Sequence, residues 1–554
     1  MKNCLNHRLI GVKMLVMLVA VIGCDTKPSK TSNTTVIDES FKFTDITDKV
    51  QLNSVYDNGE DAGELSILET IGGGVGVLDF DCDGFQDFYF AQGGNLTNRQ
   101  VTGLGGKLLR NNLNKSFQEV TANSRTACDK IYSHGISSGD FNNDGFPDLL
   151  VTGYYDIALF INQGDGTFVE NSRVAGMNSP SWGTSSALGD FDGDGCLDIY
   201  IAHYVNWSFQ NHPACQNKGK DDVFTPGLFE GLSDIIYLNN MDGTFSPKST
   251  EIGLVQEGKG LGVVTADFDL DGRIDIYVAN DTTYNFYYKN LGGSFEEIGQ
   301  KNATASDDQG TPQGSMGLCV FDYNKDLHPD LFVCNYENQS FGLYRYDEDS
   351  YFRHSTTSAG LTALGTMFVA WGTVARDFDL DGDEDIIISN GHVMRTSTAE
   401  QPPLALLNNG QSKFKRLTFA DDSYFTKLWR GRGVVAFDFD FDGDQDLLFT
   451  HIKSNVALLQ NETKISGRWW KLDLIGTKSN RNGIGASIII ESTSNKFFRS
   501  IVGGGSYLSQ NPYTVHWGLP SNESVVQVTI LWPSGTQQVL KEIPHGSSLV
   551  VVEP

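Results

Sequence analysis

Asp79-Phe80-Asp81-Cys82-Asp83-Gly84-Phe85-Gln86-Asp87 is the stretch that decides the fold, because its pattern returns six more times along the chain. Positions 1, 3, 5 and 9 of this nine-residue frame are always Asp or Asn, and position 2 is always Phe or Tyr. Start-to-start spacings are 61, 50, 77, 55, 55 and 61 residues, with the later copies beginning at Asp140, Asp190, Asp267, Asp322, Asp377 and Asp438. An internal repeat of this period indicates stacked copies of one supersecondary unit.

Carboxylates at every second position, followed by a glycine turn and a further carboxylate, are typical of a short loop that wraps a hard cation. The EF-hand is excluded, because position 12 is apolar (Phe90, Val151 and Ile201 in the first three copies) where that motif needs Glu between two helices. One such turn alone would be a solvated hairpin, but seven copies in register favour calcium. The fifth copy has Leu327 at position 6, where a positive φ would be strained, so we expect weaker or absent metal there.

Each loop lies between two apolar stretches, such as 433–437 and 447–450 around the seventh copy, and a second hairpin follows, as in 159–168. Repeated four-stranded units stack radially into a propeller, which removes exposed sheet edges. The prediction is an all-β chain with a seven-bladed β-propeller over 41–463. The seventh repeat ends at 461–463 without a last strand opened by Phe, so we expect 43–46 to complete that blade and close the ring.

These loops and hairpins resemble FG-GAP/VCBS-type repeats, the family that includes the integrin α-subunit propellers. The resemblance implies up to seven calcium ions, held by side chains at positions 1, 3, 5 and 9 with help from the position-7 backbone carbonyl. On this chain the implied ligands, in loop order, are Asp79, Asp81, Asp83, Phe85, Asp87; Asp140, Asn142, Asp144, Phe146, Asp148; Asp190, Asp192, Asp194, Cys196, Asp198; Asp267, Asp269, Asp271, Arg273, Asp275; Asp322, Asn324, Asp326, His328, Asp330; Asp377, Asp379, Asp381, Asp383, Asp385; and Asp438, Asp440, Asp442, Asp444, Asp446.

The residues after 464 carry a different set of motifs, among them 482–486, 499–509 and Trp532-Pro533-Ser534-Gly535. They resemble an ASPIC/UnbV domain, which follows such propellers in bacterial proteins and in the cartilage acidic protein family. Trp517 stands where that family usually has Phe. The resemblance implies a compact β domain over 464–554 and leaves its chemistry open.

The first 24 residues are predicted to be a signal peptide. Three basic residues open it, and the apolar run 14–22 is too short for a permanent membrane span. The stretch Val21-Ile22-Gly23-Cys24 resembles the lipobox of bacterial lipoproteins, which implies a lipid on Cys24; a plain signal peptide or an uncleaved anchor is the alternative. Residues 25–40 are polar and suit a flexible tether.

The formal net charge of −28 argues against nucleic acid as a partner, because phosphate binding needs basic patches. Export implies an oxidising setting, so the six cysteines after Cys24 are candidates for disulfides. One candidate pair is Cys319 with Cys334, which lie on either side of one turn. The other candidates, Cys196 with Cys215 and Cys82 with Cys128, are based only on their proximity in the sequence. Six free thiols are the alternative.

The residues five before and five after each loop are expected to share the end of the blade opposite the metal. The first set is small (Gly or Ser), which lets backbones crowd the axis, and the second is mostly polar. The insertion 204–233 is expected to lie over one face. A ligand site is predicted at this mouth, with a solvated polar rim as the alternative; its candidate residues are His134, His203, Asn280, Asn335, Trp371, Asn390, Arg432 and His451.

The function predicted from these features is a calcium-binding, lipid-anchored, extracytoplasmic module that binds a glycan or a protein. The alternative is an enzyme, either a polysaccharide lyase or a redox-metal protein that uses His134, His203 and His451. The sequence has no nucleophile elbow, metalloprotease helix, phosphate loop or haem motif, and no catalytic residue is assigned.

Overall fold

The computed structural model describes residues 41–213, 222–255, 257–348, 350–394, 399–464 and 467–554. The predicted signal peptide, Cys24, the tether and Cys215 lie outside the described residues. No helix in the described ranges is long and apolar enough to cross a membrane.

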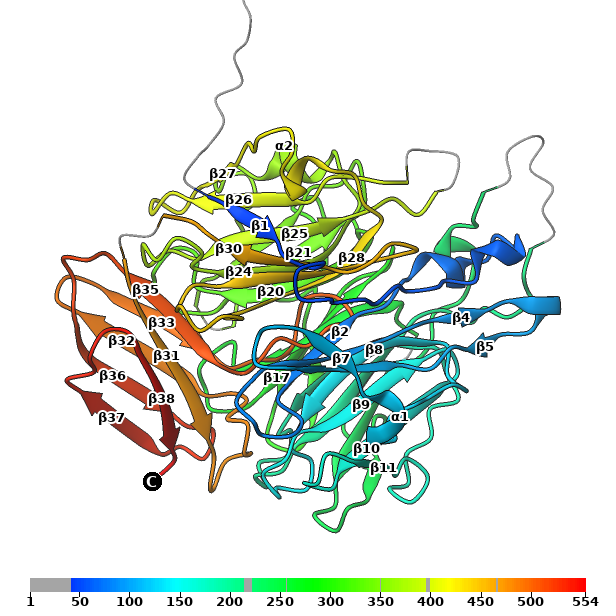
Figure 1. Cartoon of the computed structure of the whole chain (residues 1–554), viewed down its shortest axis with the longest axis horizontal. Coiled ribbons are helices and arrows are strands. Elements are labelled where there is room, and N and C mark those ends of the chain that lie inside the picture. Colours follow the sequence, from blue (N-terminus) through cyan, green and yellow to red (C-terminus); the bar gives the residue numbers. More distant parts are fainter. Residues whose placement is uncertain (1–40, 214–221, 256, 349, 395–398, 465–466) are drawn as a thin grey trace, which may run out of the picture. The chain divides into compact units, whose positions relative to one another are not determined.

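Seven antiparallel sheets built on four strands each fill the described part of 41–463, and one of them gains a fifth strand from the C-terminal residues (Figure 1). The first four sheets are β2 (Val75–Leu78), β3 (Asp87–Phe90), β6 (Lys107–Asn111), β7 (Phe117–Glu119); β8 (Ser133–Gly139), β9 (Asp148–Gly153), β10 (Asp156–Asn162), β11 (Phe168–Glu170); β12 (Gly183–Gly189), β13 (Asp198–His203), β14 (Ile235–Asn239), β15 (Phe245–Pro247); and β16 (Gly260–Ala266), β17 (Asp275–Asn280), β18 (Phe286–Asn290), β19 (Phe295–Glu297). The other three are β20 (Ser315–Phe321), β21 (Asp330–Asn335), β22 (Gly342–Tyr346), β23 (Phe352–His354); β24 (Ala370–Arg376), β25 (Asp385–Asn390), β26 (Leu404–Asn408), β27 (Phe414–Arg416); and β28 (Gly431–Phe437), β29 (Asp446–His451), β30 (Ala457–Asn461) with β1 (Phe43–Asp45).

The connections between these strands carry only short elements. These are η1 (Glu60–Ala62), η2 (Ile67–Thr70), β4 (Gly94–Asn95), η3 (Thr97–Arg99), β5 (Thr102–Gly103), α1 (Thr121–Ser124), η4 (Pro226–Leu228), α2 (Thr362–Gly365) and η5 (Tyr424–Thr426).

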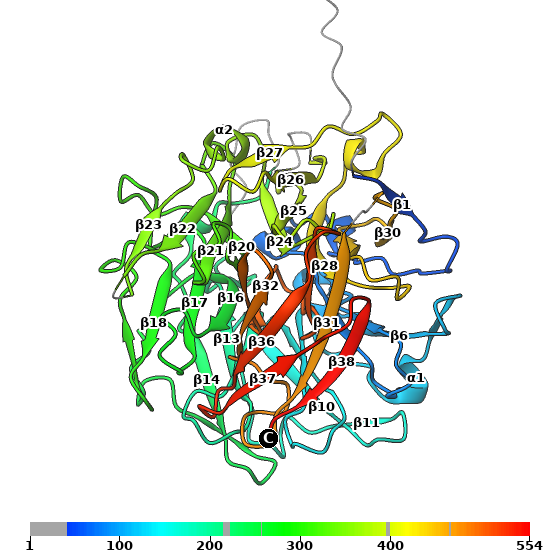
Figure 2. The ribbon, with the colours of Figure 1, turned by 90° about the vertical axis from the view of Figure 1, so that its left-hand side faces the viewer.

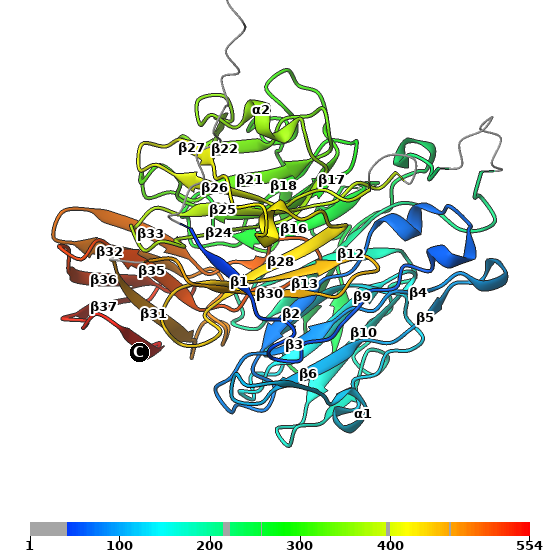
Figure 3. The ribbon, with the colours of Figure 1, turned by 45° about the horizontal axis from the view of Figure 1, so that its top comes forward.

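The sheets form a ring. Their first strands contact one another in chain order, from β2 through β8, β12, β16, β20 and β24 to β28, and β28 in turn contacts β2. The predicted closure is confirmed, because β1 pairs with β30 and places Phe43 opposite Asn461 (Figure 3). The expected all-β propeller is therefore the fold observed.

The invariant aromatic at position 2 explains how neighbouring sheets stack. Each of these rings packs against the Phe that opens the outer strand of the next sheet, with ring centroids 5.9–6.2 Å apart. The seven pairs are Phe80–Phe168, Phe141–Phe245, Phe191–Phe295, Phe268–Phe352, Tyr323–Phe414, Phe378–Phe43 and Phe439–Phe117. The N-terminal strand thus supplies, through Phe43, the ring that the seventh repeat lacks.

The small residues of the inner strands have the predicted role of bringing backbones together at the axis. A Cβ on Gly135 would collide with the carbonyl of Thr184 on the next inner strand, and one on Gly317 with the carbonyl of Trp371. The pairing differs from expectation by two residues, since His451 faces Gly431 rather than Gly433. One residue of this difference arises because Phe437, and not Asp438, faces Asp446. The other arises at the register shift between Gly431 and Val434, where the inner strand carries one extra residue.

The predicted disulfides are not formed among the described cysteines. Cys82, Cys128, Cys196, Cys319 and Cys334 are all free thiols. For Cys319 and Cys334 the reason is register, because Cys319 faces Phe332, two residues before Cys334. Cys128 instead lies 3.4 Å from the Tyr89 hydroxyl.

The C-terminal strands make two further sheets around a shared core in which Trp470 and Trp517 stack with centroids 5.9 Å apart. In Figure 2 they lie in front of the ring. The strands are β31 (Arg468–Ile475), β32 (Ser487–Ser492), β33 (Lys496–Ser500), β35 (Val515–Leu519), β36 (Val525–Leu531), β37 (Gln537–Lys541) and β38 (Ser547–Val552), while β34 (Gly503–Gly504) leaves these sheets and pairs with β16 of the ring.

Candidate functional site: the aspartate loops and the opposite mouth

All seven loops fold onto their position-1 carboxylate. In the first loop, Asp79 accepts hydrogen bonds from the backbone N–H groups of Asp83 (3.0 Å) and Gly84 (2.9 Å). Asp83 in turn accepts from the N–H of Phe85 at 3.0 Å. This wrapping brings alternate carboxylates to one side, which is the arrangement predicted from their spacing.

The backbone at positions 4 and 6 has positive φ in every loop. Position 6 lies at +85° to +97° where it is Gly, and Leu327 in the fifth loop is held at +70°. The predicted strain at Leu327 is therefore present. Position 4, occupied for example by Cys82 (+55°) and Phe441 (+64°), is also left-handed, which the sequence did not signal because only the third loop has glycine there, Gly193.

The position-9 aspartate joins the loop to the sheet. Asp87 is buried and accepts hydrogen bonds from the N–H groups of Phe80 (3.1 Å) and Asn111 (2.7 Å). In most sheets the residue equivalent to Asn111 also reaches the preceding sheet, where its amide donates to the position-2 carbonyl at 2.8–3.1 Å. These inter-sheet bonds are Asn162 to Phe80, Asn239 to Phe141, Asn290 to Phe191, Asn408 to Tyr323 and Asn461 to Phe378. Sequence reasoning did not assign this role, although the Asn before the second hairpin turn recurs.

The loops keep carboxylate oxygens that no hydrogen bond satisfies. In five loops, three aspartates offer oxygens within 4.8 Å of one another, and the described groups that could hold a metal are all of this kind. Six buried oxygens lack a partner: Asp81 Oδ1, Asp269 Oδ1, Asp379 Oδ1, Asp385 Oδ2, Asp438 Oδ1 and Asp444 Oδ1. The second and fifth loops have Asn at position 3, and there the Asn142 and Asn324 amides donate to the position-5 carboxylate.

Burial makes these carboxylates costly without a cation. It raises the pKa of Asp87, Asp148 and Asp198 to about 8, because the charged form is desolvated. Basic side chains neutralise part of the negative charge, since Arg110 forms an ion pair with Asp81 (2.6 Å) and Lys289 forms one with Asp269. An all-oxygen donor set with unsatisfied buried oxygens fits a hard divalent cation such as calcium.

The C-terminal domain contacts the aspartate loops directly. The Lys471 ammonium lies 2.5 Å from Asp438 of the seventh loop, and the N–H of Gly518 donates to Asp377 of the sixth at 2.9 Å. Arg481 lies 3.4 Å from Asp140 of the second loop. This end of the ring is thus covered over those three loops.

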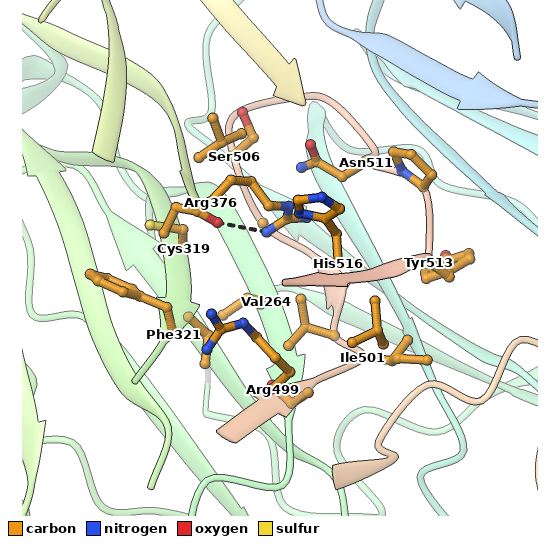
Figure 4. Close-up of a pocket in the computed structure, with 18 of the residues that line it drawn as sticks. Val264, Cys319, Phe321, Arg376, Arg499, Ile501, Ser506, Asn511, Tyr513 and His516 are labelled. Carbon is orange, nitrogen blue, oxygen red and sulfur yellow. Dashed lines mark hydrogen bonds between the residues drawn. The ribbon is translucent and has the colours of Figure 1, made fainter. Parts of the chain in front are cut away.

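Residues 503–511, here called the axial loop, extend from that domain into the centre of the ring. Ser506 hydrogen-bonds with Leu318 of β20, the carbonyl of Leu508 accepts from Ile136 of β8 at 3.0 Å, and Gln510 bonds with Val75 and Val77 of β2. Beside it lies a cavity of about 70 Å³ lined by Arg376, Arg499 and His516 (Figure 4). The axial loop therefore ties together inner strands that are far apart in the sequence.

The mouth opposite the aspartate loops holds a larger cavity, of about 650 Å³. Its walls come from the strand ends of successive sheets (Tyr204, Asp281, Tyr336), its roof includes Phe224 and Leu228 of the insertion, and η2 completes one side. Within the described residues, this part of the insertion lies over the face, as predicted.

The eight predicted ligand residues are at this mouth but are buried, with 0–2% of each residue's surface exposed. Trp371 lines the cavity, and the other seven are not among its lining residues. The Arg432 guanidinium, for example, donates to the Thr70 and Gly431 carbonyls and lies 4.1 Å from the Trp371 ring centre. Asn280, Asn335 and Asn390 hold turns by donating to the carbonyls of Tyr284, Ser340 and Pro402.

The structure does not bring the three histidines of the enzyme alternative together. His203 contacts Ser179 and the Ser233 carbonyl, and His451 contacts Tyr424 and the Asn455 carbonyl. Burial lowers the pKa of His134, His203 and His451 to about 4, so they are neutral near pH 7. His203 and His451 thus bond within their own repeats, whereas the His134 ring contacts the Gly72 carbonyl and stacks on Trp182, which belong to the neighbouring repeats.

Comparison with protein-family models identifies the repeat. A model described as "FG-GAP-like repeat" matches residues 79–151, 140–201, 217–278, 267–333 and 322–388, together more than half of the chain. The chain belongs to the FG-GAP-like repeat family. A second model, "ASPIC and UnbV", matches residues 476–554 of this FG-GAP chain.

Among curated proteins, the FG-GAP chain is similar to cartilage acidic protein 1. It is 23% identical to that of Xenopus tropicalis over 468 residues (83% of this chain, 61% of the relative) and 24% identical to that of Homo sapiens over 497 residues (87% and 62%). The chain thus spans about three fifths of these relatives' length. A solved Agrocybe aegerita structure, described as recognising non-reducing terminal N-acetylglucosamine, matches with a TM-score of 0.38 and 16% identity, covering 81% of this chain and 100% of that one.

Proposed function

We propose that this FG-GAP protein is a lipid-anchored, extracytoplasmic binding or adhesion module for a glycan or protein ligand, and that calcium in its aspartate loops keeps the ring rigid. The observation that carries the calcium part is the aspartate triad found in five loops, together with buried, unpartnered carboxylate oxygens that recur at position 3 (Asp81, Asp269 and Asp379). Membership of the FG-GAP family and similarity to cartilage acidic protein 1 support the binding role.

The role proposed for calcium is structural. Each loop connects an inner strand to the second strand of its sheet, and its position-9 carboxylate also holds the third strand. Without metal, three or four carboxylates repel one another inside each turn. A cation bound only by the folded state would add its binding free energy to the stability of the ring.

The first experiment measures thermal unfolding of the chain from residue 25 onward in calcium, in magnesium and with excess chelator. Calcium is expected to raise the melting temperature, and metal analysis of the dialysed protein should find several calcium ions per chain. An unchanged melting temperature on chelation, together with no bound metal, would refute the calcium role.

The binding role is tested separately. The calcium-loaded protein is screened against glycan and extracellular-protein arrays, with a chelated sample as the matched control. Calcium-dependent binding of a glycan or protein supports the proposal. Absence of any ligand in both arrays, from protein whose calcium-loaded fold is verified by melting, would contradict it.

The lipid anchor has its own test. Expression of the full chain in a bacterium with labelled fatty acid should label the protein, and Cys24→Ser should remove the label. Equal labelling of the Cys24→Ser variant would exclude the anchor.

A further inference from the structure

The cavity at the mouth opposite the aspartate loops has the size of a small-molecule site. Its volume of about 650 Å³ lies within the usual range for ligand pockets, roughly 300–1,000 Å³. The axial loop closes it from below, because Tyr507 is fully buried, packs on Trp371 with ring centroids 4.8 Å apart, and donates to the Ile71 carbonyl at 3.2 Å. The cavity is therefore blind rather than a passage through the ring.

The lining is mainly apolar and aromatic. Aromatic rings come from Tyr204, Phe224, Tyr336 and Trp371, and aliphatic surface from residues such as Ile71 and Met316. A sugar needs many fixed polar partners, whereas this lining offers few. The body of a ligand that fits it is apolar.

Among the described lining residues, Asp281 carries the one charged side chain. Its carboxylate accepts a hydrogen bond from the Tyr204 hydroxyl at 2.6 Å, which leaves acceptor capacity on the carboxylate. Two of the hydroxyl donors nearby are engaged elsewhere, since Thr70 donates to the Ile67 carbonyl and Thr282 to its neighbour's carbonyl. Lys259 lies outside the lining, with its ammonium on the Pro226 carbonyl at 2.9 Å. Burial raises the pKa of Asp281 to about 6 and the charge of Lys259 lowers it, so the carboxyl is mostly ionised at pH 7.

We infer that this cavity binds a small apolar organic amine, with the protonated ammonium on Asp281 and the apolar body among the aromatic rings. A carboxylate beside several aromatic rings is complementary to a cation, through a charge-assisted hydrogen bond and cation–π attraction. The same geometry disfavours carboxylic acids, because their charge would meet that of Asp281. This site is independent of the glycan or protein ligand proposed above and of calcium binding.

The test compares three probes that share one ring system: 2-naphthylmethylamine, 2-naphthalenemethanol and 2-naphthoate. Their affinities for the calcium-loaded protein are measured by calorimetry at neutral pH. The amine is expected to bind about tenfold more tightly than the alcohol, and the acid not detectably. Equal affinities, or no binding of the amine at millimolar concentration, would overturn the inference.

Two variants and a control locate the site. Asp281→Asn keeps a partner for Tyr204 and should bring the amine's affinity down to that of the alcohol, whereas Asp308→Asn, at an exposed aspartate outside the lining, should leave the preference intact. Val393→Trp places a large side chain in the cavity and should abolish binding of both amine and alcohol. An amine preference that survives Asp281→Asn, or amine binding unchanged by Val393→Trp, would refute the assignment.

Discussion

Gly74→Ala tests whether the axial loop holds the ring together. Gly74 immediately precedes β2, and its φ lies outside the left-handed region, so an alanine is acceptable to the strand itself. Its Cβ, however, would run into the backbone carbonyl of Leu508 and approach the Ser509 hydroxyl to 2.8 Å. The colliding atoms belong to the backbone, which cannot move away by a rotamer change as the end of a side chain can.

The magnitude follows from what the axial loop would lose on moving. The Leu508 carbonyl accepts from the Ile136 N–H at 3.0 Å, and the Ser509 hydroxyl accepts from the Val75 N–H at 3.2 Å. Two buried hydrogen bonds at about 1 kcal/mol each, with about 1–3 kcal/mol for overpacking, give an expected loss of about 3–5 kcal/mol in the free energy of unfolding.

The assay is urea unfolding of the calcium-loaded protein, followed by tryptophan fluorescence. Gly227→Ala is the matched control, because that exposed glycine would place its Cβ 3.7 Å from the nearest atom, Thr225 Oγ1, and a surface change of this kind costs within about 0.5 kcal/mol. If Gly74→Ala were as stable as Gly227→Ala, the axial loop would not be tightly seated against β2.

Three further predictions concern the loops and the C-terminal domain. Leu327→Gly should raise the free energy of unfolding by about 1 kcal/mol, because it relieves a left-handed backbone; a loss in urea unfolding would contradict this. Asp269→Asn should remove the calcium-linked stabilisation of one loop, about 2.7 kcal/mol when free calcium is a hundred times Kd, and should therefore reduce the calcium-induced rise in melting temperature. Asp308→Asn should not reduce that rise, and equal rises in the two variants would refute the ligand role of Asp269. Although burial alone would raise it, the pKa of Glu553 is held at about 2 by hydrogen bonds from Ser534 and from the N–H groups of 477–479, so this group stabilises the fold above its ordinary pKa of about 4.5. Glu553→Gln should therefore lower the free energy of unfolding by about 3 kcal/mol at pH 7. In urea unfolding at a series of pH values, the difference in this free energy between variant and unaltered protein should become smaller as the pH falls below 4.5. A difference that does not change with pH would refute the role given to the Glu553 carboxylate.

Much of the aspartate loops could be predicted from the sequence because their geometry is local. Alternation brings positions 1, 3 and 5 to one side within nine residues, and the carboxyl of position 1 folds back on the N–H groups of positions 5 and 6. The aromatic residue at position 2 and the role of Phe43 as the missing outer-strand residue can both be predicted, because each belongs to a pattern that repeats. The left-handed backbone at position 4 cannot be predicted in this way, because the residue type there varies between loops, as Cys82 and Phe441 illustrate.

The candidate ligand residues show where a one-dimensional pattern stops being informative. The pattern predicts a ligand site formed by polar side chains at the far ends of strands, with a solvated rim as the alternative, and these side chains do lie at that end. Their exposure depends on what covers them, however, and the insertion, η2 and Tyr507 come from segments hundreds of residues apart. His203 and His451 are buried against side chains of their own repeats, Ser179 and Tyr424.

The sequence by itself determined the repeat, the composition of its loops, the all-β ring and the strand that closes it, because each is written in spacings of a few residues or in a repeated period. Only the tertiary structure decided that the axial loop fills the centre of the ring, that the C-terminal domain covers three aspartate loops, and that a blind apolar cavity with Asp281 remains at the other end. Those features depend on contacts between segments without a shared pattern, such as Leu508 with Ile136, and packing complementarity of that kind leaves no periodic signal in a single sequence.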